Sequence, residues 1–160
     1  MVATETATND VMSSTPTKEE LSNKLISSAS KWAAAATCIP LNGLDLVALA
    51  SVQANLIVNI SALYGEKPSK YVVSGTISTL LATLAPAYGA QLAVPVLLKW
   101  IPFGNLVGIA TLAGFGAAAT YAVGKVFVDH YENGGTFADF SATAASGELK
   151  SAFTSKVANS

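Results

Sequence analysis

One stretch of this chain has the residue types and spacing of a nucleotide site. The segment "GFGAAA", Gly114 to Ala119, fits the G-x-G-x-x-A pattern of a dinucleotide-binding turn. Asp139 lies about twenty residues further on, where that pattern places a ribose-binding carboxylate. The pattern also requires a strand before it inside a β-α-β unit, and nothing upstream alternates strand and helix. We therefore assign no dinucleotide site to these glycines, and we expect no cofactor.

The other residues capable of chemistry are few and scattered. The segment "VDHYE" brings Asp129, His130 and Glu132 together, but the chain has one histidine, and metal sites need three or four converging ligands. A lone histidine near the end of a helix more often interacts with the helix dipole. Cys38, the single cysteine, precedes Ile-Pro in an apolar setting that favours an inert, buried thiol. The sequence thus provides no catalytic, cofactor-binding or metal-binding residues and predicts that the protein is not an enzyme.

The composition points to a membrane or to a large buried interface. The chain has 160 residues and a mean hydropathy of +0.47, and 12% of its residues are charged, against about 25% in ordinary soluble domains. From Tyr71 to Gly124 the only charged side chain is Lys99. A soluble monomer needs more polar cover than this. All nine basic residues are lysines, and no basic stripe is visible, so nucleic-acid binding is not expected.

The elements that would position these residues are predicted to be helices. Residues 1–14 are polar and are expected to be disordered. A helix then begins at "TKEE", where Thr17 and Glu20 form a capping-box pattern. The apolar residues of this helix share one face, which suits either a membrane surface or a bundle: Leu21, Leu25, Ala29, Trp32, Ala33 and Ala36.

A second helix is predicted over "LDLVALASVQANLIVNISALYG", ending at Gly65. Ser51, Asn55 and Asn59 recur every four residues along it and form a polar stripe on an otherwise apolar helix. Two explanations stay open. The stripe could form hydrogen bonds between helices, or it could line a pore.

The rest of the hydrophobic region forms hairpins. Tyr71 to Leu98 is uncharged, and Pro86 and Gly89 divide it into either one broken span or two shorter helices. A last long helix runs on from Asn105 and ends at Gly134–Gly135. The lysines at the hairpin ends place Lys67, Lys70 and Lys125 on the cytoplasmic side and Lys99 at the far turn.

Small residues form two ridges on the last long helix. The first consists of Gly116, Thr120 and Gly124, and the second of Ala110, Gly114 and Ala118, each with a spacing of four residues. Small residues at this spacing let helix backbones approach closely inside a bilayer. We therefore predict that both ridges serve helix packing or oligomerisation, with a partner helix in the same chain or in a neighbouring subunit.

Four landmarks occur in a characteristic order: "IPLNGLDLVAL", "LYGEKPSK", "LLKWIPFGNLVG" and "ATYAVGKVFVDHYENGGTF". Over roughly residues 38–137 the chain resembles the YcjF-type membrane-domain family, an uncharacterised bacterial family often found C-terminal to Era-like GTPase domains. The resemblance implies a helical, membrane-associated domain with no established activity. The chain has no G-x-x-x-x-G-K-[ST] motif, so any GTPase would be a separate partner.

Together these patterns predict an all-α protein whose helical hairpins form a membrane-associated bundle. The helical hydrophobic domain is expected over residues 15–137, followed by a flexible tail, 138–160, with one short amphipathic helix. The expected role is structural: a non-enzymatic, self-assembling scaffold in the bacterial inner membrane or an internal membrane, with lipid as a partner and both termini cytoplasmic. A small oligomeric pore and a soluble helical ring or shell are the alternatives.

Overall fold

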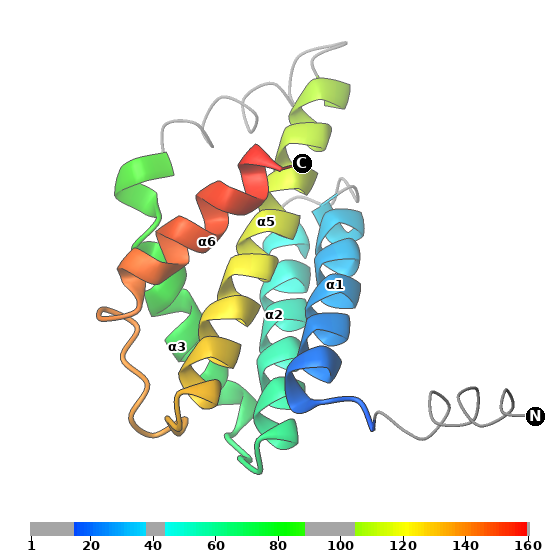
Figure 1. The fold of residues 1–160 in the computed structure, drawn as a ribbon. Coiled ribbons are helices and arrows are strands. Elements are labelled where there is room, and N and C mark those ends of the chain that lie inside the picture. Colours follow the sequence, from blue (N-terminus) through cyan, green and yellow to red (C-terminus); the bar gives the residue numbers. More distant parts are fainter. Residues whose placement is uncertain (1–14, 38–43, 89–104, 160) are drawn as a thin grey trace, which may run out of the picture.

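The computed structural model describes residues 15–37, 44–88 and 105–159. Within these ranges every regular element is an α-helix, in the order α1 (Lys18–Thr37), α2 (Leu44–Leu63), α3 (Lys70–Ala82), α5 (Asn105–Glu132) and α6 (Ser146–Ala158). Figure 1 shows α1 and α3 running in one direction, α2 and α5 running back, and α6 lying obliquely across α5. The predicted all-α bundle of hairpins is confirmed. The predictions for residues 1–14, Cys38, Gly89 and Lys99 lie outside the described residues.

Local signals in the sequence set the ends of the helices. At the start of α1, the Glu20 amide donates to Thr17 Oγ1 (3.1 Å) and the Thr17 amide donates to Glu20 Oε2 (3.0 Å), as the capping box predicts. After α2, Gly65 has a φ of 88°, its amide donates to the Ala62 carbonyl, and the Glu66 amide donates to the Ser61 carbonyl. This is a Schellman motif, in which glycine takes the left-handed position.

The helix α5 ends in the same way. Gly134 has a φ of 82° and its amide donates to the Tyr131 carbonyl, while the Gly135 amide donates to the carbonyl of His130. Both turns need a residue without a Cβ at the left-handed position. The predicted stops at Gly65 and at Gly134–Gly135 therefore agree with the structure.

The uncharged stretch after the α2–α3 link divides into separate helices. Helix α3 ends at Ala82, and residues 85–88 are again helical, with Pro86 in the first turn of this new segment. Pro86 has no amide hydrogen to donate to the carbonyl of Ala82, so α3 cannot continue through it. Along α3, four hydroxyl groups each donate to the carbonyl four residues earlier, those of Ser74, Thr76, Ser78 and Thr79.

The core surrounds α5, which contacts α1, α2, α3 and α6. Most of its residues from Ala118 to Tyr131 are buried. Large side chains from the other helices close around this segment, among them Ile26, Ile57, Ile60, Val73, Ile77, Leu80, Leu149 and Phe153. Each such side chain contributes about 1.5–3 kcal/mol when it is fully buried, so α5 is the helix on which the bundle is built.

The buried face of α1 differs from the predicted one. The residues that face the core are Ser22, Ile26, Ser30 and Ala33. Leu25 and Ala29 are half-buried, and the Trp32 side chain is 68% exposed. The hydrophobic pattern had placed Leu25, Ala29 and Trp32 on the buried side. On either side of Ile26 this face carries the small residues Ser22, Ser30 and Ala33, because α1 lies close to α5 there.

The segment after α5 belongs to the bundle. Leu149 and Phe153 of α6 are buried, and the Phe153 ring packs against Phe115 and Tyr88 at centroid distances of 5.0 and 4.8 Å. This arrangement differs from the flexible tail expected for residues 138–160, because the two apolar residues are one turn apart and together cover the side of α5.

Replacing Phe153 with alanine should therefore lower the free energy of unfolding by about 3–5 kcal/mol, because a cavity opens beneath α6. Urea denaturation of the purified chain in a mild detergent would measure the change. Val157→Ala on the same helix is the matched control, since Val157 is 51% exposed, and it should change stability by no more than about 0.5 kcal/mol. Equal stability of the two variants would show that α6 is not part of the cooperative unit.

Candidate functional site

The first ridge of small residues faces other helices of the same chain. A Cβ added at Gly124 would lie 2.6 Å from Cγ1 of Ile26 on α1 and 3.2 Å from Cδ2 of Leu56 on α2. Thr120 is fully buried, and its Oγ1 accepts a hydrogen bond of 3.3 Å from Nε2 of Gln53 on α2. Gly116, one turn earlier, is also buried. This ridge lies where α1 and α2 meet α5.

The second ridge lies mostly outside the bundle. Ala118 is buried, but Gly114 and Ala110 are exposed, and no atom of the described residues lies within 4 Å of the position that a Cβ on Gly114 would take. Figure 1 shows the first turns of α5 extending past the ends of α1 and α2. The two ridges therefore meet different surroundings, although the sequence presents them alike.

Polar side chains that the sequence pattern did not single out are buried between α2 and α5. Gln53 and Ser61 are fully buried on the face of α2 that meets α5. Ser61 Oγ lies 2.8 Å from the Tyr131 hydroxyl and donates to the Ile57 carbonyl at 2.7 Å. Gln53 Oε1 has no partner among the described residues. Gln53 and Ser61 are eight residues apart, close to two turns, and this spacing could have revealed the seam.

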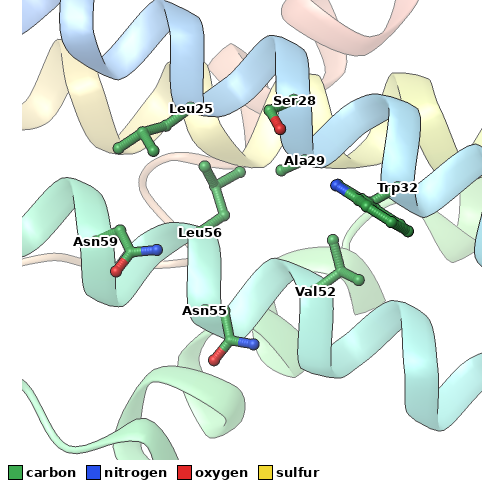
Figure 2. Close-up of a pocket in the computed structure, with 8 residues that line it drawn as sticks. All are labelled: Leu25, Ser28, Ala29, Trp32, Val52, Asn55, Leu56 and Asn59. Carbon is green, nitrogen blue, oxygen red and sulfur yellow. The ribbon is translucent and has the colours of Figure 1, made fainter.

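The predicted polar stripe lies on the opposite side of α2. Asn55 and Asn59 are exposed and Ser51 is half-buried. Asn55 and Asn59 line an open groove of about 260 Å³ between α1 and α2, drawn in Figure 2. The lining residues are Leu25, Ser28, Ala29, Trp32, Val52, Asn55, Leu56 and Asn59. Asn55 and Asn59 thus face a surface groove in a single copy of the chain.

One end of the bundle holds a cluster of aromatic and charged side chains. The Tyr64 hydroxyl donates to the Glu132 carboxylate, the Tyr64 ring stacks on Tyr131 with centroids 5.1 Å apart, and Lys18 Nζ lies 5.4 Å from the Tyr64 ring centre. Burial, together with the hydrogen bond to Glu132, raises the pKa of Tyr64 to about 12. The phenol is protonated at neutral pH, and the cluster joins α1, α2 and α5.

His130 closes the turn after α5. Its Nε2 lies 2.9 Å from the Thr136 carbonyl and 2.9 Å from Asp139 Oδ1, so this nitrogen carries the hydrogen that both acceptors need. The backbone amide of Thr136, followed by His130, lowers the pKa of the Asp139 carboxyl. Among the described residues no group of three or more His, Cys, Asp or Glu side chains could hold a metal ion. The contacts of His130 with Asp139 and Thr136 therefore stabilise the turn after α5.

One helix has the length and composition of a membrane span. It is Ala110–Glu132 within α5, and 56% of its most apolar window is buried inside the bundle. The central helix of a water-soluble bundle would meet the same criteria, so this helix by itself is weak support for a membrane.

Comparisons with known proteins connect this fold with a family. A family profile described as "Domain of unknown function (DUF697)" matches residues 7–156. "Magnetosome membrane protein 22" of Magnetospirillum gryphiswaldense is 38% identical over 123 residues, which cover 76% of this chain and 63% of the relative. The chain therefore spans less than two thirds of that relative's length. No solved structure matches.

The position of Gly124 generates a paired prediction. Gly124→Ala should lower the free energy of unfolding, because overpacking against Ile26 costs about 1–3 kcal/mol and helix propensity returns at most about 1 kcal/mol. Gly114→Ala, at an open position of the same helix, should leave stability unchanged or raise it by up to about 1 kcal/mol. Melting temperatures of the two variants would test this. A similar shift in both would argue against a close α1–α5 approach at Gly124.

The two polar sides of α2 should respond differently to alanine. Gln53→Ala should cost about 2–3 kcal/mol, because it leaves a cavity and removes the hydrogen-bond partner of Thr120. Asn59→Ala should change stability by no more than about 0.5 kcal/mol, since Asn59 is exposed. Chemical denaturation of both variants measures the contrast. A larger loss for Asn59→Ala would mean that the groove face, and not the α2–α5 seam, holds the bundle together.

Proposed function

This chain belongs to the DUF697 family, and on that premise we propose that it is a membrane-associated, non-enzymatic scaffold domain. The family is the YcjF-type one that the sequence landmarks resemble. The observation that carries the proposal is the 38% identity to a relative described as a magnetosome membrane protein. We infer from it that the partner of this chain is a lipid bilayer, in the bacterial inner membrane or an internal membrane.

The distribution of charge supports this proposal. The start of α1, the α2–α3 link and the end of α5 lie at one end of the bundle in Figure 1. This charged end holds Lys18, Glu19, Glu20, Glu66, Lys67, Lys70, Asp129 and Glu132. At the opposite end the exposed residues of α5 are uncharged, Ala110, Thr111 and Gly114 among them. A charged cluster at one end of the bundle, with uncharged exposed residues where α5 projects at the other, suits a boundary between water and hydrocarbon.

A role without catalysis agrees with how the polar side chains are used. Tyr64 is bound to Glu132, and His130 is bound to Asp139 and to the Thr136 carbonyl, so both serve contacts between elements. The buried Gln53 joins α2 to α5. Tyr64, His130 and Gln53 thus each have a structural partner that accounts for their position.

Self-assembly is the second part of the proposal. Gly116, Thr120 and Gly124 meet helices of their own chain, so they are not free to meet another copy. Ala110 and Gly114 are exposed, no atom of the described residues lies near a Cβ built on Gly114, and both could accept a close helix from a second copy. A separate GTPase is a further proposed partner, on the strength of the family resemblance. The start of α1 would lie on the cytoplasmic side with Lys67 and Lys70, whereas the C-terminal end of α6 lies nearer the other end of the bundle (Figure 1).

Exposure of the polar stripe favours one alternative function. Because Asn55 and Asn59 are open on the surface of a single copy, several copies arranged around an axis would place Ser51, Asn55 and Asn59 along a shared lumen. Such an assembly would be a small pore. Ion flux in reconstituted liposomes, lost in the Asn55→Leu/Asn59→Leu variant while assembly persists, distinguishes this pore from a scaffold.

Fractionation of cells tests the membrane proposal directly. The full-length protein is expected to stay in the membrane pellet after alkaline carbonate washing and to enter solution on addition of detergent. Light scattering of the detergent-extracted particle would then report self-assembly. A monodisperse protein in buffer without detergent would contradict membrane association, and if its mass were that of a ring or shell it would support the soluble oligomer.

A further inference from the structure

The groove between α1 and α2 is lined by apolar side chains of which Trp32 is exposed, Leu25, Ala29 and Val52 are half-buried and Leu56 is buried. Its floor is formed by Leu25 and Ala29 of α1 and by Val52 and Leu56 of α2, and Trp32 stands at one end of it (Figure 2). Trp32 is among the most exposed of the large hydrophobic residues that the structure describes, at 68%. An aromatic side chain contributes most of its free energy only when it is covered, so this surface favours an apolar occupant.

The groove exists because α1 does not bury its most hydrophobic face. The face that meets α5 carries Ser22 and Ser30 around Ile26, while Leu25 and Trp32 lie beside it at the edge. No other described segment of the chain covers this edge. Among the described residues, this edge of α1 is therefore open to an apolar partner.

The rim of the groove is positively charged. Lys24 directly precedes Leu25 and Lys31 directly precedes Trp32, and both lysines are exposed on the side of α1 that also presents Ser28. Neither lysine forms an ion pair with any residue that the structure describes. The part of α2 that lies across the groove from α1, Ala48 to Leu63, contains no charged residue. The uncharged donors Asn55 and Asn59 complete the lining.

We propose that this groove binds an anionic phospholipid, with one acyl chain along the apolar floor and the phosphate at Lys24 and Lys31. The proposal rests on the membrane association proposed above and adds a site and a lipid class to it. A cavity of about 150 Å³ is enough to hold benzene in an apolar core, so the groove of about 260 Å³ has room for a segment of hydrocarbon chain. Its open side lets the rest of the lipid continue into the bilayer.

Charge argues against a second copy of the chain as the occupant. A two-fold contact across the groove would bring the Lys24 and Lys31 of each copy to one rim, and like charges at an interface are unfavourable. A negatively charged headgroup instead compensates both lysines. The apolar floor of the groove matches the acyl chain of an anionic phospholipid. Its polar lining matches the polar region that joins chain and headgroup, and the two lysines match the phosphate.

Quenching of Trp32 fluorescence tests the proposal. The full-length chain in a non-ionic detergent would be titrated with phosphatidylglycerol or phosphatidylcholine carrying brominated acyl chains, and the signal of a Trp32→Phe variant would be subtracted to remove Trp100. Quenching is expected at lower concentrations of the anionic lipid. Lys24→Gln/Lys31→Gln should lower that preference by roughly thirtyfold, because each lysine near an anionic headgroup contributes a factor of about five. Lys150→Gln, an exposed lysine on α6, should leave it unchanged.

Other outcomes would overturn the site. The site would be wrong if both lipids quenched Trp32 equally, or if the preference for the anionic lipid survived in the double lysine variant. It would also be wrong if millimolar inorganic phosphate displaced the lipid, or if the particle mass doubled and the Trp32 signal changed with dimer formation instead of with lipid. Because the titration is done in detergent micelles, it does not depend on where the protein lies in the cell. A chain that binds the anionic lipid yet fractionates as soluble would refute only the proposed membrane residence.

Discussion

The spacing of α1 and α5 depends on one contact, in which the Ile26 side chain fills the place of the missing side chain of Gly124. Because the two helices lie this close, the residues of α1 on either side of Ile26 must be small, and Ser22 and Ser30 are buried there. Because the face of α1 with Ser22, Ile26 and Ser30 is turned toward α5, the Trp32 side chain faces outward. A tightly packed core and an uncovered apolar groove are therefore two results of a single backbone approach.

The sequence predicts those parts of the fold that depend on neighbouring residues. The capping box at Thr17 and the glycine stops at Gly65 and Gly134 each involve at most six consecutive residues, so their geometry follows from local chemistry. The buried face of α1 could not be predicted in this way. Hydrophobicity ranks Trp32 above Ser30, but the shape of α5 decides which of them fits against it, and that shape is a tertiary property.

The candidate site was likewise predictable only where its features depend on neighbouring residues. The four-residue spacing marked both Gly124 and Gly114 as packing positions, but spacing does not say which of them has a neighbour. Along α2, the regular four-residue stripe identified Asn55, whereas the sparser spacing of Gln53 and Ser61, eight residues apart, was overlooked. Gln53, which joins α2 to α5, was thus missed because the stripe of Asn55 and Asn59 on the surface is more regular.

The hydroxyl groups along α3 have a consequence for how the bundle meets its surroundings. Ser74, Thr76, Ser78 and Thr79 each use their hydrogen on a carbonyl of their own helix, so none of these groups needs a water molecule as a partner. The outer side of α3 can lie against water or against hydrocarbon without leaving a donor unsatisfied. In the proposed membrane-associated state, the level of the bilayer surface along this helix could therefore shift with bilayer thickness without breaking any of these hydrogen bonds.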